Sequence, residues 1–154
     1  MSGFRLYFAQ HGLALDNAVD PQRPLSDAGK QQTQAVASKL LSASIPIKQV
    51  FHSGKLRAEQ TARIFASTLQ IDHVCAIDQL SPNDDVTIFA SSLTVDGALY
   101  VGHLPHLEKL VAYLLSGNEN CNIIKFRNSA TLCLLKSDGH DQLQWHLIPE
   151  LAIN

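Results

Sequence analysis

Arg5-Leu6-Tyr7-Phe8-Ala9-Gln10-His11-Gly12 begins with a short apolar run and stops at a histidine followed by glycine. Much later, Ala98-Leu99-Tyr100-Val101 ends in the same way, at Gly102-His103-Leu104-Pro105. Each segment indicates a buried strand that gives way to a loop or helix. In open α/β sheets, ligands bind outside the carboxyl ends of the strands. We therefore expect the two histidines to meet across one pocket, an arrangement that suits phosphoryl transfer with a histidine nucleophile.

The remaining sequence alternates between predicted strands and helices. Strands are expected at 4–10, 49–53, 73–77, 98–102, 122–126, 131–136 and 143–148. Helices are expected at 28–42, 56–69, 86–93 and 105–115. The alternation predicts a three-layer α/β/α domain with a mainly parallel sheet, and the antiparallel tail strands make that sheet mixed. No linker or repeat divides the 154 residues, so a single domain covering 1–154 is expected.

Composition restricts the cellular setting and the partners. The net charge is -2 with neutral histidines, so no general basic field attracts nucleic acid. No apolar run approaches the ~18 residues of a membrane-spanning helix, and no signal peptide is evident. Cys75, Cys121 and Cys133 are odd in number and widely spaced, which favours free thiols. We expect a cytoplasmic protein that binds neither nucleic acid nor membranes.

Five residues are candidates for phosphoryl chemistry. His11 could act as a covalent nucleophile, and Gly12 would let the backbone approach a ligand closely. Arg57 opens a predicted helix, whose amino end favours phosphate, and its guanidinium can hold phosphate bidentately. Arg23 lies in a loop, and His103, when protonated, would donate to phosphate oxygens. Taken singly, each also has an ordinary interpretation as a solvated or packed side chain.

Three segments together resemble a known family. They are Gln10-His11-Gly12; Arg23-Pro24-Leu25-Ser26 with Gly29, followed by Ser53 through Arg57-Ala58-Glu59-Gln60-Thr61; and Val101-Gly102-His103-Leu104-Pro105. Their order and spacing resemble the histidine phosphatase superfamily, most closely its small branch of SixA-type phosphohistidine phosphatases. The resemblance spans about residues 4–115, and the Arg-Ala-Glu-Gln-Thr run is its most specific part.

The resemblance implies a role for each matching residue. His11 would take up the phosphoryl group, Arg57 and His103 would bind its oxygens, and Arg23 would contact the phosphate or the incoming substrate. Water would then hydrolyse the phosphohistidine without a metal or other cofactor. The substrate would be a phosphorylated protein, such as a histidine-containing phosphotransfer domain of a signalling relay, and phosphate or sulfate would occupy the site.

One position departs from the family pattern. The family's opening motif is Arg-His-Gly, whereas this chain has Gln10, which keeps a hydrogen-bond donor in the phosphate site but loses the charge. Removal of one transition-state donor costs roughly 10²–10³ in rate. Lys55, Lys125 or Arg127 could compensate if one of these side chains reaches the pocket; otherwise they are solvated surface groups.

The sequence does not identify which residue would donate a proton to the leaving group. Asp84 and Asp85 occupy roughly the loop where larger family members carry a carboxylate, but they could equally cap the helix at Val86. Three functions remain after the phosphohistidine phosphatase: a small-molecule phosphomonoesterase, a weakened module that only binds phosphate or phosphoprotein, and a metal site. The metal hypothesis rests on His103 and His106, which are three residues apart.

Overall fold

A computed structural model describes residues 3–138 and 141–153. They form a six-stranded sheet in the order β3-β2-β4-β1-β5-β6. The strands are β1 (Phe4–Gln10), β2 (Gln49–His52), β3 (Val74–Ala76), β4 (Ala98–Gly102), β5 (Thr131–Lys136) and β6 (Gln142–Leu147). The first four are parallel, and β5 and β6 are antiparallel. The predicted mixed, mainly parallel sheet is confirmed.

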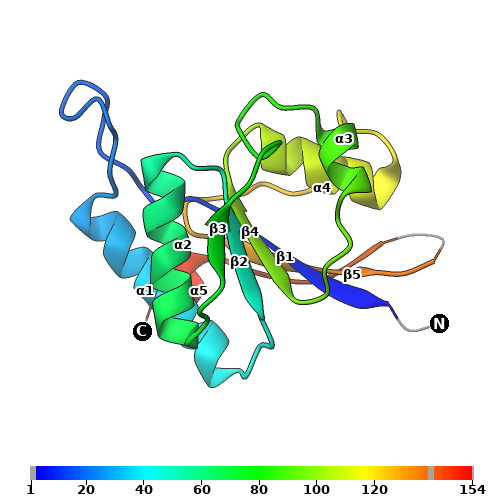
Figure 1. The fold of residues 1–154 in the computed structure, drawn as a ribbon, viewed down its shortest axis with the longest axis horizontal. Coiled ribbons are helices and arrows are strands. Elements are labelled where there is room, and N and C mark those ends of the chain that lie inside the picture. The colour runs from blue at the N-terminus through cyan, green and yellow to red at the C-terminus, as the bar shows by residue number, and fades with distance from the viewer. Residues whose placement is uncertain (1–2, 139–140, 154) are drawn as a thin grey trace.

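Helices cover both faces of this sheet (Figure 1). The helices α1 (Asp27–Ser42) and α2 (Leu56–Leu69) pack on one face, and α3 (Val86–Ser91) and α4 (His106–Ser116) pack on the other. Two apolar clusters result because strand residues alternate between the faces: Leu6 and Phe8 face α3 and α4, whereas Tyr7 and Ala9 face α1 and α2. The fold is therefore the predicted three-layer α/β/α arrangement.

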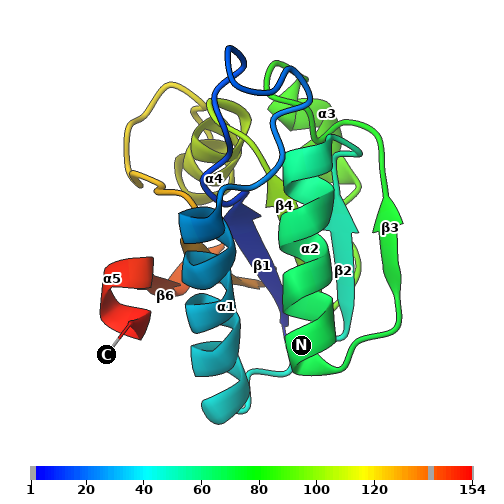
Figure 2. The same cartoon turned by 90° about the vertical axis from the view of Figure 1, so that its left-hand side faces the viewer.

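The centre of the sheet positions the two histidines. Strands β1 and β4 are adjacent and parallel, and their last residues, Gln10 and Gly102, are register partners. The next residue of each chain segment is therefore a histidine at the same edge. The His11 amide extends the pairing by donating to the Gly102 carbonyl at 3.0 Å. Figure 2 shows this edge at the top of the sheet, where the long loops gather beside the start of α2.

The local predictions are most accurate for the elements that surround this edge. The predicted bounds of β1, β4, β5 and α2 agree with the structure, and Ser26 caps α1 by accepting a hydrogen bond from the Gly29 amide at 3.0 Å. The predicted 105–115 helix begins one residue later, since Pro105 takes the cap position of α4. The short helix α5 (Pro149–Ala152) was not predicted.

The predicted strand at 122–126 is wrong. These residues follow α4 without regular secondary structure, because β5 already occupies the free edge of β1. Ile124 and Phe126 instead pack against the core cluster on the α4 side, and the Phe126 amide donates to the Glu108 carboxylate at 2.9 Å. The β-branched residues in this segment fit a half-buried coil as well as a strand.

Candidate active site

His11 is held so that one ring nitrogen is available to react. Its side chain is 9% exposed, and its Nδ1 lies 2.7 Å from the Gly12 carbonyl oxygen. A carbonyl can only accept, so Nδ1 carries the proton and Nε2 keeps its lone pair. Burial, together with the charges of Arg57 and Arg23, lowers the pKa of His11 to about 4 against the opposing effect of the Gly12 bond. His11 is therefore a neutral imidazole at pH 7.

His103 faces His11 across the edge of the sheet. The two ring centroids are 5.0 Å apart, and the rings are inclined at 49°. His103 is 1% exposed, and its Nε2 lies 2.6 Å from the Ser53 hydroxyl oxygen. Burial and the neighbouring charges of His11, Arg57 and Lys55 lower its pKa to about 3. The ring is therefore neutral at pH 7 until an anion arrives, whose negative charge would raise this pKa.

Two arginines supply positive charge to the pair of histidines. Arg57 lies in the first turn of α2, and its buried Nε has no hydrogen-bond partner. Burial and the charge of Arg23 lower the pKa of Arg57. Arg23 has a φ of 50°, unusual for a residue with a side chain, and its Nε donates to the Leu15 carbonyl at 3.0 Å. The two guanidinium groups are thus held near His11 without a carboxylate partner among the described residues.

The Arg57-Ala58-Glu59-Gln60-Thr61 run also fastens the loops around the nucleophile. The Thr61 hydroxyl accepts from the Gly12 amide at 2.8 Å and donates to the Arg57 carbonyl at 2.7 Å. The Gln60 Oε1 accepts from the Leu25 amide at 2.7 Å, just after the Arg23 loop. One turn of helix therefore fixes the backbone on both sides of the site. Gln60 and Thr61 were part of the motif, but these hydrogen bonds were not predicted from the sequence.

A second support comes from the segment before β5. Asn128 donates from Nδ2 to the His11 carbonyl at 3.1 Å, and the Ser129 amide donates to the Gln10 carbonyl at 3.1 Å. Because Asn128 is 117 positions from His11, no local sequence pattern pointed to it. The main chain of His11 is consequently held by β4 on one side and by this segment on the other.

Close packing excludes side chains at two glycines near His11. A Cβ at Gly12 would meet the Thr33 hydroxyl at 2.8 Å, and one at Gly29 would meet the Leu13 carbonyl oxygen at 2.1 Å. The second contact is with backbone, which cannot move without displacing the loop that follows His11. These contacts bring the amino end of α1 directly against the nucleophile loop.

Gln10, the residue that departs from the Arg-His-Gly motif, lies at the end of β1. It is 9% exposed, and its buried Oε1 has no hydrogen-bond partner. A buried amide oxygen without a partner is costly, so this atom marks an incompletely satisfied position beside His11. Gln10 carries no charge, and therefore Arg57 and Arg23 are the two cations that act on His11.

The two predicted proton donors, Asp84 and Asp85, both accept hydrogen bonds from nearby backbone amides. Asp85 caps α3 by accepting from the Thr87 amide at 2.8 Å, in agreement with the capping alternative. Asp84 accepts from the Ser81 amide at 2.9 Å. The charge of Asp84 also acts on the buried His106, whose ring lies 5.5 Å from that of Phe89. Among the described residues, neither carboxylate is hydrogen-bonded to His11 or His103.

The metal hypothesis gains no ligand cluster in the structure. Within residues 3–138 and 141–153, no group of three or more His, Cys, Asp or Glu side chains is placed to hold a metal ion. His106 points away from solvent into the core at 1% exposure.

Within residues 3–138 and 141–153, no helix combines the length and apolar character needed to cross a bilayer.

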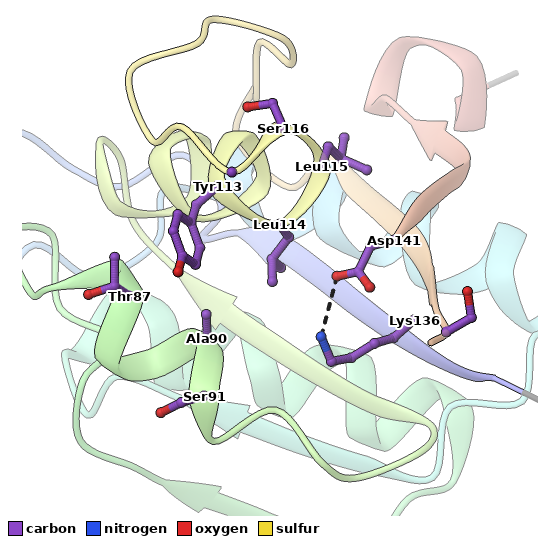
Figure 3. A pocket seen from close by; sticks show the side chains of 11 residues that line it. Thr87, Ala90, Ser91, Tyr113, Leu114, Leu115, Ser116, Lys136 and Asp141 are labelled. Atoms are coloured by element: carbon purple, nitrogen blue, oxygen red, sulfur yellow. Dashed lines mark hydrogen bonds and ion pairs between the residues drawn. The ribbon is translucent and has the colours of Figure 1, made fainter. Parts of the chain in front are cut away.

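A separate cavity of about 650 Å³ lies at the opposite end of the sheet. It is bounded by α3, by the carboxyl end of α4, and by Lys136, at the end of β5, with Asp141, just before β6 (Figure 3). Within it, Lys136 pairs with Asp141 at 3.5 Å. Lys136 is the register partner of Phe4, the first residue of β1, so this cavity is remote from His11. It takes no part in the chemistry of the histidine pair.

Known proteins match both the sequence and the fold. Residues 6–81 match the histidine phosphatase superfamily (branch 1). The chain is 30% identical to the phosphohistidine phosphatase SixA of Escherichia coli strain K12, and the match covers 94% of each chain. The chain belongs to the histidine phosphatase superfamily. It is also 36% identical over 80 residues to an uncharacterized protein of Picosynechococcus, of which it spans 48%.

A solved structure of this superfamily agrees over nearly the whole chain. The structure of the protein histidine phosphatase SixA complexed with tungstate has a TM-score of 0.85 and 28% sequence identity. The match covers 96% of this chain and 98% of that chain. Tungstate is a tetrahedral oxyanion like phosphate. The family and this fold together support a phosphatase.

Proposed function

We propose that the protein is a metal-independent phosphohistidine phosphatase with His11 as the nucleophile. The observation that carries this proposal is the state of His11: a neutral ring, Nδ1 bound to the Gly12 carbonyl, and Nε2 left with its lone pair near two arginines. Phosphoryl transfer depends mainly on positioning and on stabilising charge at the equatorial oxygens. In this proposal Arg57, Arg23 and His103 stabilise those oxygens, which the charges of the two arginines near His11 support.

The proposed reaction has two displacements. The His11 Nε2 attacks phosphorus and the bond between phosphorus and the substrate nitrogen breaks. The substrate imidazole, already protonated at its other ring nitrogen, takes the electron pair of that bond and leaves as a neutral ring. Water then attacks the phosphorus of phosphorylated His11, the bond between phosphorus and Nε2 breaks, and phosphate leaves as a proton of the water passes to solvent. The electron pair of that bond returns to Nε2, which regenerates the neutral His11 ring. Because a protonated imidazole is a good leaving group, the reaction does not require a strong acid from Asp84 or Asp85. A phosphoramidate is therefore a more suitable substrate than an oxygen ester.

The substrate we propose is a phosphohistidine on a protein, such as a histidine-containing phosphotransfer domain of a cytoplasmic signalling relay. A protein-borne phosphoryl group must reach the nucleophile from outside. The histidines lie at the sheet edge among loops, and no large inserted segment separates the motifs. The names of the SixA relatives, a phosphohistidine phosphatase and a protein histidine phosphatase, support this class.

The test measures phosphate release from a phosphorylated histidine-containing phosphotransfer domain, with EDTA present. Wild type, His11→Ala and Gln10→Arg are compared side by side, with a small phosphate ester as a second substrate. We expect release by the wild type, none by His11→Ala and faster release by Gln10→Arg. Silence from all three proteins on both substrates would refute the catalytic proposal.

The alternative is a module that binds a phosphorylated partner without turnover. The observation that favours it is Gln10, an uncharged and incompletely hydrogen-bonded side chain beside the nucleophile. The same assay separates the two functions. Phosphate binding without release by the wild type, with turnover restored by Gln10→Arg, would identify the binding module.

A further inference from the structure

The proposed phosphate site lacks a cation at Gln10, and one nearby lysine is placed to provide it. Lys55 occupies the cap position of α2, two residues after Ser53 and two before Arg57. Its amide donates to the Ser53 hydroxyl at 3.3 Å, and that hydroxyl lies 2.6 Å from Nε2 of His103. The backbone of Lys55 is therefore tied directly to a group that contacts a site histidine.

The position of Lys55 is unfavourable for a cation unless an anion binds there. A helix amino end carries partial positive charge and usually attracts acidic or capping side chains. Lys55 makes no side-chain cap, and within the described parts of the chain its ammonium group is in no ion pair. The acidic residue of the same turn, Glu59, is paired with Arg63 at 3.0 Å. Two cations, Lys55 and Arg57, thus share the positive end of α2.

The other two cations considered from the sequence are less suitable. Arg127 is engaged by Glu150 in an ion pair. Lys125 lines a groove with Glu108 beside α4, and its charge does not contribute to the lowered pKa of His11 or His103. The charge of Lys55, in contrast, acts on His103. Its exposed side chain is free to turn toward an oxyanion held between the histidines.

We infer that Lys55 is a phosphate-binding residue that supplies, from the start of α2, the positive charge absent at Gln10. This inference rests on the proposed phosphate site but concerns a residue whose position, rather than its motif, suggests the role. The lysine would contact the phosphoryl oxygens on the His103 side. Arg57, whose charge acts on both histidines, would contact oxygens between them, and Arg23 would contact those on the His11 side.

The experiment measures tungstate and phosphate binding by calorimetry, and turnover separately, in five proteins: wild type, Lys55→Met, Lys55→Arg, Gln10→Arg and the double variant of Lys55→Met and Gln10→Arg. Methionine keeps the length of the side chain and removes the charge. Lys109→Met is the matched control, since Lys109 is an exposed lysine on α4 whose charge does not act on either histidine. Thermal unfolding verifies that every variant is folded.

We expect Lys55→Met to weaken oxyanion binding by about tenfold and Lys109→Met by less than about twofold. In the Gln10→Arg background, Lys55→Met should cost only about twofold, because the arginine already neutralises the same anion. Lys55→Arg should retain most of the affinity. Equal effects of Lys55→Met and Lys109→Met would overturn the inference.

The two proposals can fail independently. If the wild type shows no turnover but Lys55→Met weakens tungstate binding, the enzymatic proposal fails and the role of Lys55 stands. If turnover requires His11 but Lys55→Met behaves like Lys109→Met, the enzyme stands and the role of Lys55 is refuted. An undiminished tenfold loss in the Gln10→Arg background would show that Lys55 does not compensate for Gln10.

Discussion

Removal of the Thr61 hydroxyl should separate the nucleophile loop from α2. Thr61 is fully buried and joins the Gly12 amide to the Arg57 carbonyl with bonds of 2.8 and 2.7 Å. Thr61→Val has nearly the same shape and a similar helix propensity, so it removes the hydroxyl without creating a large cavity. The Arg57 carbonyl keeps the main-chain bond of the helix, whereas the Gly12 amide loses its partner.

The expected cost follows from that one buried amide. An unsatisfied buried donor costs about 1–3 kcal/mol, so Thr61→Val should lower the free energy of unfolding by about 2 kcal/mol. For a chain of this size the midpoint of thermal unfolding should fall by about 4–8 °C. Turnover should fall more than about tenfold, because the Gly12 carbonyl that holds the His11 ring is displaced relative to Arg57.

Urea unfolding, calorimetry and phosphate release measure the three quantities. Thr68→Val is the control, because Thr68 lies on the same helix but its hydroxyl only accepts an exposed bond from Gln34 at 2.9 Å. We expect that variant to lose less than about 0.5 kcal/mol. A Thr61→Val protein as stable and active as Thr68→Val would refute the view that this hydroxyl fixes the site.

Three further predictions concern pH and packing. The pKa of His11 is about 4 in the folded protein against 6.5 ordinarily, so its contribution to stability is complete above pH 6.5 and is lost as the pH falls toward 4. The midpoint of unfolding should therefore decrease as the pH falls from 6.5 to 4, and it should decrease less in His11→Ala. Gly29→Ala should destabilise by more than about 2 kcal/mol despite better helix propensity, since its Cβ meets the Leu13 carbonyl oxygen at 2.1 Å; wild-type stability in urea would contradict the contact. Glu108→Ala should speed hydrogen exchange of the Phe126 amide, because that amide donates a hydrogen bond to the Glu108 carboxylate at 2.9 Å. An unchanged exchange rate would show that this hydrogen bond does not protect the amide.

The elements with clear local signals were predictable from the sequence. The apolar runs that stop at glycine and histidine defined β1 and β4, and an amphipathic stripe defined α2. The pairing of those two strands brings His11 and His103 together, as expected from the general position of ligand sites in open sheets. Residues 122–126 were wrongly predicted as a strand, because apolar, β-branched residues can also pack against the core as a coil, as Ile124 and Phe126 do here.

The hydrogen-bond frame of the site was not predictable in the same way. Thr61 and Asn128 reach the His11 loop from 49 and 117 positions away, respectively, and neither lies in a pattern that announces such a bond. The low pKa of His103, about 3, was likewise not readable from the sequence, because it results from burial and from the neighbouring positive charges of the folded chain. Both features depend on what the folded chain places around a residue, which residue type and spacing do not specify.

The glutamine at position 10 weakens the binding of the phosphoryl oxygens but favours the nucleophilicity of His11. An arginine there would stabilise the phosphoryl oxygens, but its charge, added to those of Arg57 and Arg23, would lower the pKa of His11 further and weaken its lone pair as a nucleophile. Lys55 avoids part of this conflict, because its charge acts on His103 and does not contribute to the lowered pKa of His11. Positive charge supplied from the start of α2 can therefore stabilise the bound phosphoryl group while His11 remains basic enough to attack it.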